Sequence, residues 1–241
     1  MCGYFSTQFL SCARGLRDLF FPRRCVVCGR ALAEEEADLC AACLSELPLT
    51  WQWDVVQNAA FERLARRFEV EAAAALIRFG AASDYRRILY GIKYGGRRAL
   101  GRRMGALLGS YLAGSRAFAG CQAVVPVPLH PLRRWKRGYN QSEEIARGVA
   151  AAMGIPLETA LVRRSRHTKT QTRLRRTARE KNVQGAFRLD ARCAEALERQ
   201  GIRRLLVIDD VLTTGATLAA CAEPLRAGGF RICCATIAFA D

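Results

Sequence analysis

The sequence has no apolar run that approaches the ~20 residues needed to cross a membrane, which excludes a transmembrane helix. Its first 25 residues have no basic start and no clean apolar segment, so no secretory signal is predicted. It contains no Gly-Lys-Ser/Thr string, which excludes a phosphate loop of the Walker type. These absences predict a cytoplasmic protein, whose eleven cysteines are mostly free thiols or metal ligands.

Acidic residues are scarce, at 22 against 38 basic ones, and the net charge is +16. The positive excess is concentrated in three segments, and the rest of the chain is close to neutral. Blocks of this kind suit polyanions: phosphorylated small molecules, nucleic acids or anionic membrane surfaces. The three segments are Arg86–Arg103, Arg133–Arg137 and Arg163–Lys181.

Four of the cysteines form two CxxC pairs separated by eleven residues, Cys25 with Cys28 and Cys40 with Cys43. Each pair can present two thiolates from a tight knuckle, and four thiolates complete a closed tetrahedral zinc site. Two disulfides are the alternative, although CxxC in a reducing compartment more usually binds metal. Because such a site keeps no open position, the zinc is expected to fold a segment too small for its own core.

After Pro48 the chain alternates between strands and helices, which predicts an α/β domain with a mostly parallel sheet flanked by helices. The predicted boundary separates residues 1–50, a helix with the zinc-ribbon-like segment, from a domain at 51–241. Ser142 is expected to cap a helix at 142–153. The other expected helices span 84–94, 98–113 and 216–227, and the expected strands span 70–79, 123–128, 205–208 and 231–240.

One buried strand ends in two acids, Asp209 and Asp210, before a threonine-glycine loop and a helix. In an open α/β sheet this places the acids and the loop where ligands bind. The loop's N–H groups and hydroxyls suit a phosphate, and the positive end of the helix adds favourable charge. The acids would repel that phosphate, so we expect them to face ribose hydroxyls or Mg²⁺. The structural alternative is an acid pair followed by an ordinary capped helix.

Residues 207–218, VIDDVLTTGATL, resemble the binding motif for phosphoribosyl pyrophosphate (PRPP) of type I phosphoribosyltransferases. Almost the whole chain resembles the competence protein F (ComF) family. The resemblance implies the type I phosphoribosyltransferase fold, a structural zinc, and PRPP bound with Mg²⁺ beside Asp209 and Asp210 as catalytic residues. It rests on the CxxC pairs and on the segments IKYGG (92–96), PVPLH (126–130), RGYNQ (137–141), TKTQ (168–171) and NVQGAF (182–187). The implied PRPP-binding residues are Val211, Leu212, Thr213, Thr214, Gly215, Ala216 and Thr217.

The resemblance also implies a second loop that contacts the pyrophosphate. For His130 a packing or hydrogen-bonding role is the alternative, and for Arg133 a solvated basic turn. Lys93 is expected on a helix surface, with a phosphate contact as the minority interpretation, and Asn140 either caps the next helix or contacts a ligand. The implied pyrophosphate-loop residues are Val127, Pro128, Leu129, His130 and Arg133.

Residues 163–181 stand in the place of the flexible loop that closes over PRPP in this fold and excludes water. They could instead form a solvated loop or a nucleic-acid contact surface, with Tyr139 or Trp135 for base stacking. The predicted loop contacts are Arg166, Lys169, Gln171 and Arg173.

Three functions of different class remain open from the sequence. One is an enzyme that displaces pyrophosphate from PRPP with an unidentified nitrogen acceptor. The second, implied by the ComF resemblance, is a PRPP-binding protein that acts in DNA uptake, with single-stranded DNA and competence helicase-type proteins as partners. The third is a PRPP-dependent transcriptional regulator, which ranks last because the sequence shows no helix-turn-helix element.

Overall fold

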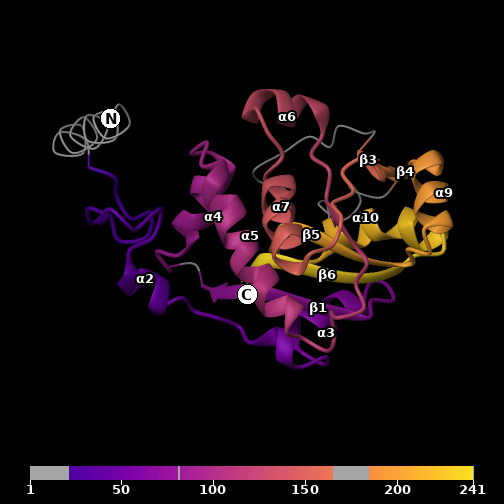
Figure 1. The fold of residues 1–241 in the computed structure, drawn as a ribbon, viewed down its shortest axis with the longest axis horizontal. Helices are drawn as coiled ribbons and strands as arrows, with labels where there is room; N and C mark the ends of the chain where they lie inside the picture. Colours follow the sequence, from indigo (N-terminus) through magenta and orange to yellow (C-terminus); the bar gives the residue numbers. More distant parts are fainter. Residues whose placement is uncertain (1–21, 81, 165–184, 241) are drawn as a thin grey trace, which may run out of the picture. The chain divides into compact units, whose positions relative to one another are not determined.

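The computed structural model describes residues 22–80, 82–164 and 185–240, which form two compact units (Figure 1). The first unit holds the described residues up to Leu47 together with Ser83–Ile88, and the second holds the rest. The expected N-terminal helix and the loop residues Arg166, Lys169, Gln171 and Arg173 lie outside the described residues. None of the helices in the described ranges is long and apolar enough to cross a membrane.

The first unit has a very small apolar interior. Its short helix α2 (Ala41–Ser45) follows a knuckle in which the Gly29 N–H donates to the Cys25 carbonyl at 2.9 Å. The Tyr85 hydroxyl donates to the carbonyls of Cys43 and Glu46, at 3.2 and 2.9 Å. The buried hydrophobic residues described in this unit are Cys25, Val27, Cys40, Cys43, Leu47 and Ile88.

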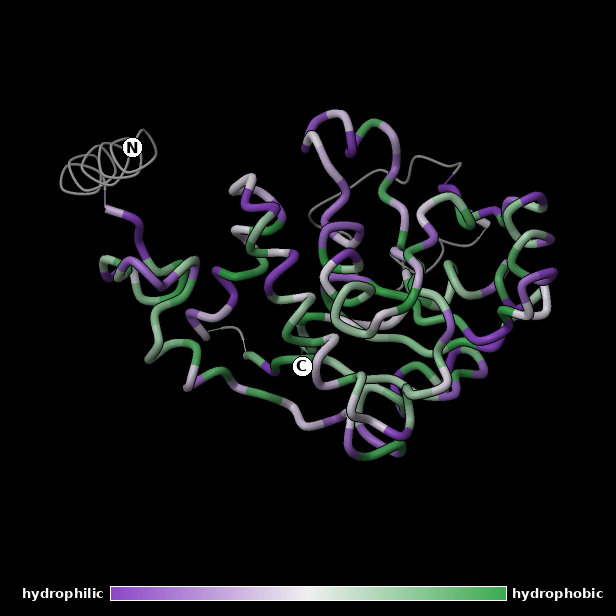
Figure 2. The backbone as a smooth tube through the Cα atoms, in the orientation of Figure 1, coloured by the Kyte–Doolittle hydropathy of each residue, from purple (hydrophilic) through white to green (hydrophobic). Residues whose placement is uncertain are grey.

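The second unit is built on four parallel strands in the order β1-β6-β5-β2. The strands are apolar on both faces because helices cover both faces, and Figure 2 shows β5 and β6 mainly in the hydrophobic colour. The predicted class is confirmed: a mostly parallel α/β sheet flanked by helices, with a small four-cysteine segment. The strands are β1 (Ala72–Phe79), β2 (Ala123–Pro126), β5 (Arg204–Leu212) and β6 (Arg231–Ala240), and β3 (Val162–Arg164) pairs antiparallel with β4 (Phe187–Leu189).

Alternation along the strands gives the sheet two packed faces. Leu205 and Val207 belong to a core that includes residues of α3 and α10, while α7 packs on β5, on β2 and on α5. Helices α5 and α7 run side by side (Figure 1). The helices of this unit are η1 (Gln52–Asp54), α3 (Ala59–Ala65), α4 (Arg86–Lys93, which begins in the first unit), α5 (Arg98–Ala113), α6 (Pro131–Arg137), α7 (Gln141–Met153), α9 (Ala191–Arg199) and α10 (Ala216–Ala227).

Glycines let the backbones of α5 and α7 approach each other closely. A Cβ atom at Gly148 would lie 2.0 Å from the Arg102 carbonyl oxygen, and one at Gly105 would lie 2.1 Å from the Ile145 carbonyl oxygen. Real Cβ atoms do not make such contacts, so larger residues at these positions would push the two helices apart.

The sheet has a topological switch point between its neighbouring strands β2 and β5. The chain leaves β2 for α7 and leaves β5 for α10, and these two helices pack on different faces. Where connections diverge in this way, the crevice outside the carboxyl ends of the strands is the usual ligand site. The loops after β2 and β5 therefore meet at the edge where a ligand is expected.

The structure corrects two local predictions from the sequence. Asn140 caps α7 in place of Ser142, since its Oδ1 accepts the Ser142 N–H at 3.2 Å. The Ser142 hydroxyl instead donates to Asp209. Strand β5 also continues to Leu212, so both aspartates lie within the strand and their side chains point to opposite faces of the sheet.

Candidate functional site

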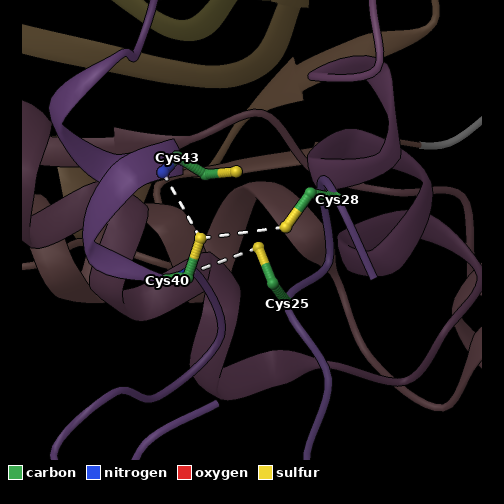
Figure 3. A group of neighbouring side chains, drawn as sticks. All are labelled: Cys25, Cys28, Cys40 and Cys43. Carbon is green, nitrogen blue, oxygen red and sulfur yellow. Dashed lines mark hydrogen bonds between the residues drawn. The ribbon is translucent and has the colours of Figure 1, made fainter. Parts of the chain in front are cut away.

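The four predicted zinc ligands converge on one point in the first unit (Figure 3). Their sulfur atoms all lie within 4.8 Å of one another, and the Sγ atoms of Cys28 and Cys40 are 3.8 Å apart. The backbone N–H of Cys40 donates to the Cys25 sulfur, and that of Cys43 donates to the Cys40 sulfur, each at 3.4 Å. The described cysteines are free thiols, so the disulfide alternative is not realised.

The electrostatics of this cluster favour a bound metal. Burial raises the pKa of the Cys25 thiol, but hydrogen bonds from the N–H groups of Cys28, Cys40 and Val27 outweigh burial and lower the pKa to about 6. Burial raises the pKa of Cys43, whose thiol lies among the other sulfurs. A metal ligand must be a thiolate, and Zn²⁺ supplies the charge that stabilises four of them. The predicted structural zinc site thus fits both the geometry and the donor atoms.

In the second unit, Asp209 is tied to the interior. Its Oδ1 accepts the Ser142 hydroxyl at 2.8 Å and the Asp210 N–H at 2.9 Å. Burial and the neighbouring Asp210 charge raise the pKa of Asp209 to about 7, although both hydrogen bonds and Lys93 oppose the rise. A carboxyl group with this pKa exchanges its proton near neutral pH.

One carboxylate oxygen of Asp210 has no partner within the part of the chain that the structure describes. Its Oδ1 lies 3.1 Å from the Lys93 ammonium group, so Lys93, which was expected on a helix surface, is partly buried in an ion pair. Its Oδ2 is buried and has no hydrogen-bond partner among the described residues. Since a buried carboxylate oxygen is normally paired, this atom marks the place where a ligand hydroxyl or a cation would bind.

Two arginines, one in α3 and one in the turn after it, bind the backbone carbonyls of the threonine-glycine loop. The Arg63 guanidinium donates to the Thr213 carbonyl at 2.8 Å, and Arg67 donates to the Thr214 carbonyl. The described peptide bonds are all trans, so each carbonyl and the following N–H point in opposite directions. The N–H groups of Thr214 and Gly215 are therefore turned away from the arginines.

Gly215 is the N-cap of α10 and has a φ of 78°, a conformation that favours glycine. The Ala216 N–H reaches the Thr214 hydroxyl at 3.4 Å. Within the part of the chain that the structure describes, the N–H groups of Thr213, Thr214 and Gly215 donate to no protein acceptor. Three donors at the start of a twelve-residue helix form an environment suited to an anion.

In the predicted pyrophosphate loop, Val127 and Pro128 have no N–H group to offer to a phosphate. The Val127 N–H donates to the Ile208 carbonyl at 2.9 Å, and the Val127 carbonyl accepts from Asn140 at 3.0 Å, so Val127 serves the sheet. Pro128 has no N–H to offer. His130 is the N-cap of α6, and its Nδ1 accepts the Leu132 N–H at 3.2 Å. Of the remaining N–H groups, that of Leu129 donates to no protein acceptor among the described residues, so it is available to a phosphate.

Arg164 of β3 is a partly buried cation near Asp209. Burial lowers the pKa of Arg164, the nearby Arg133 lowers it further, and the Asp209 carboxylate opposes both effects. Arg133 of α6 and Asp209 of β5 are therefore both close enough to Arg164 of β3 to influence its charge. A multiply charged anion there would be attracted by cations from separate elements.

Reasoning from the sequence missed several residues of this site. Arg63 and Arg67 are four positions apart, which places them on one side of a helical turn, but no sequence pattern identifies backbone carbonyls as their targets. Ser142 was predicted only as a cap. Tyr139 is wrong as a stacking residue, because its ring is buried and its hydroxyl donates to the Ile92 carbonyl. Trp135 is exposed, as that prediction requires.

Comparison with known proteins finds one matching domain profile and several curated relatives. A profile of the double zinc ribbon domain matches residues 16–53, which include all four cysteines. Competence protein F from Haemophilus influenzae is 37% identical over 105 residues, which cover 44% of each chain. The chain is a relative of competence protein F. The resemblance predicted from the sequence is thereby confirmed.

Further relatives are DNA utilization proteins. YhgH of Escherichia coli K12 is 32% identical over 145 residues, which cover 59% of this chain and 61% of that protein. The matches thus span about half of the length of the curated relatives. Among solved structures, the chain is similar to glutamine PRPP amidotransferase from B. subtilis complexed with ADP and GMP, with 20% identity and a TM-score of 0.36, over 57% of this chain and 26% of that one.

Proposed function

We propose that the crevice at the carboxyl end of β5 binds PRPP together with Mg²⁺. The observation that carries this proposal is the buried Asp210 Oδ2, which has no partner among the described residues. Leaving a charged, buried oxygen unpaired costs on the order of a few kcal/mol. A ribose hydroxyl or a hard cation would remove that penalty, and carboxylate oxygens are the ligands that Mg²⁺ prefers.

The phosphate of the sugar is assigned to the loop that begins α10. The N–H groups of Thr214 and Gly215 point away from the arginines that hold the loop, and the threonine hydroxyls add further donors. The positive end of α10 attracts an anion at the same place. Asp210 would then contact the sugar or its cation, because a carboxylate next to a phosphate is repelled.

The pyrophosphate is assigned to the loop after β2. The Leu129 N–H group would donate to it there, and Arg133 of α6 would add positive charge. The contacts proposed for Arg166, Lys169, Gln171 and Arg173 complete this assignment. Mg²⁺, when bound with PRPP, neutralises part of the pyrophosphate charge.

The biological role follows from the relatives. Proteins that are named for competence and for DNA utilization share 30% to 37% identity with this chain. We therefore propose that the protein takes part in DNA uptake, handles single-stranded DNA and works with helicase-type competence proteins. The net charge of +16 supports a polyanionic partner.

An active phosphoribosyltransferase is the second candidate, and the pKa of Asp209 favours it. A buried carboxyl group that titrates near pH 7 is suited to proton transfer. In this case the protein would transfer phosphoribose to a nitrogen acceptor, with Asp210 close to the sugar.

Calorimetric titration with PRPP and Mg²⁺ tests the proposal. Asp210→Asn should weaken binding by about tenfold or more, because it removes a charge that contacts the ligand. Asp54→Asn is the matched control, since this exposed carboxylate lies outside the crevice. Binding that survives Asp210→Asn unchanged would refute the site. Pyrophosphate release with a panel of nucleobases would identify an enzyme.

A further inference from the structure

A second concave surface lies between the end of α4 and α6. It encloses about 410 Å³ and combines cations with aromatic rings. The described residues that line it include four cations and no acid. One of them, Lys93, is paired with Asp210, and the others face the hollow from α6. The lining residues are Lys93, Tyr94, Gly96, Arg133, Lys136, Arg137 and Tyr139.

Exposed aromatic side chains occur on the elements that form this hollow, and one of them, Tyr94, lines it. Tyr90 and Tyr94 are 66% and 67% exposed, and Trp135 is 81% exposed. Trp51 is the one other aromatic side chain with comparable exposure among the described residues. Because apolar rings gain free energy when they leave water, a group of exposed rings indicates a surface that a partner covers.

The rings and cations are held together by specific contacts. The ring centres of Tyr90 and Tyr94 are 5.2 Å apart, and the Arg137 guanidinium lies 5.2 Å from the centre of the Tyr94 ring. Buried Tyr139 donates its hydroxyl to the Ile92 carbonyl, which fixes the turn after α6 to the last turn of α4. The surface is therefore ordered before a partner arrives, which lowers the entropy lost on binding.

We propose that this surface, which we define as the α4–α6 surface and which comprises Tyr90, Tyr94, Trp135 and the hollow, binds single-stranded DNA. Unpaired bases can stack on the exposed rings while the cations contact the phosphates. A duplex hides its base faces and would use only the charge. The choice of DNA rests on the proposed role in DNA uptake. The hollow shares Lys93 and Arg133 with the surroundings of the proposed PRPP site, whereas Tyr90, Tyr94 and Trp135 have no proposed PRPP contact.

The binding of a labelled oligo(dT) of about 20 nucleotides, followed by fluorescence anisotropy, tests this proposal. Tyr94→Ala and Trp135→Ala should each weaken binding about fivefold or more, since each removes one stacking platform. Tyr94→Phe and Trp135→Phe keep a ring and should bind like the wild type. Trp51→Ala is the control for loss of an exposed ring elsewhere, and it should leave binding unchanged.

The charged part of the surface has its own measurement. Lys136→Gln should lower the slope of log affinity against log salt by about 0.7, the value for one phosphate contact on a single strand. Arg116→Gln, at another exposed position, should leave the slope unchanged. An abasic oligonucleotide of the same length should bind more weakly and should be insensitive to Tyr94→Ala.

Three results would overturn the proposal. The first is wild-type oligo(dT) affinity in both alanine variants. The second is an equal loss of affinity for the abasic strand. The third is that the alanine variants lose binding to phosphatidylserine vesicles while their oligo(dT) affinity stays at the wild-type value, which would indicate a membrane surface. Titrations with PRPP separate this proposal from the previous one: Tyr94→Ala should keep PRPP binding, and Asp210→Asn should keep oligo(dT) binding.

Discussion

The four-cysteine unit and the parallel-sheet unit differ in what fixes their side chains. In the first, a handful of buried apolar residues surrounds four sulfur atoms that lie within 4.8 Å of one another. In the second, a two-faced apolar sheet orders the crevice residues. Metal coordination requires only the right ligands at the right spacing, whereas an α/β crevice depends on many packing contacts. The first site is therefore visible in a short sequence pattern, and the second is visible only in outline.

Removal of the zinc should have the largest effect and should be confined to the first unit. Structural zinc contributes on the order of 10 kcal/mol to the folding of small domains. Cys40→Ser should abolish zinc binding and hydrogen-exchange protection at 22–47, while β5 keeps its protection. Cys193→Ser, outside the cluster, is the control. Equal loss of protection in β5 would show that the two units fold as one.

A buried carboxyl group should make the second unit sensitive to pH. The folded-state pKa of Asp209 is raised from 3.8 to about 7, so its contribution to stability is full below about pH 4 and is lost as the pH rises through 7. In Asp209→Asn, the denaturation midpoint should vary less with pH between pH 4 and 7 than in the wild type. Asp54→Asn should retain the wild-type profile, and an unchanged profile in Asp209→Asn would contradict the burial of the group.

Overpacking between α5 and α7 should damage only the second unit. Gly148→Leu would place side-chain atoms inside the backbone of α5 and should lower the free energy of unfolding by about 3 kcal/mol. Its zinc content should stay at the wild-type level. Ala151→Leu, at an exposed position of the same helix, should change stability little. Chemical denaturation and metal analysis together test whether damage to the second unit leaves the first unit intact. Loss of zinc in Gly148→Leu would contradict this independence.

The smallest effect concerns the support of the threonine-glycine loop. Arg67→Ala removes one hydrogen bond to the Thr214 carbonyl and should weaken PRPP binding about fivefold, which corresponds to ~1 kcal/mol. Arg66 and Arg67 both line a pocket of about 510 Å³, but Arg66 makes no hydrogen bond to the loop among the described residues. Arg66→Ala is therefore the matched control. If the two variants bound PRPP with equal affinity, a role of Arg67 in positioning the loop would be contradicted.

Patterns with a fixed physical period allowed much of the fold to be predicted. The helices at Arg98–Ala113 and Ala216–Ala227 and the strand Arg231–Ala240 have the expected bounds, because each is a long segment limited by glycine or by a charge. Short elements such as α6 and β3 were missed, since seven and three residues show no clear periodicity. The CxxC spacing predicted the cysteine cluster in full.

The crevice could be predicted only in part because its geometry depends on tertiary packing. The sequence predicted Asp209 and Asp210 as an equivalent pair. In the structure Asp209 accepts a hydrogen bond from Ser142, whereas Asp210 Oδ2 has no partner in residues 22–80, 82–164 and 185–240. Strand alternation implies that the two point to opposite faces, but it does not reveal what lies on each face. Likewise, the exposure of Tyr94 and the burial of Tyr139 depend on how α4 meets the turn after α6.

A crystal structure with PRPP and Mg²⁺ tests the central claim most directly. The sugar phosphate should accept hydrogen bonds of about 3 Å from the N–H groups of Thr214 and Gly215, and Asp210 Oδ2 should contact a ribose hydroxyl or the cation. A phosphate bound elsewhere, or an Asp210 Oδ2 that still contacts neither sugar nor cation, would contradict the account.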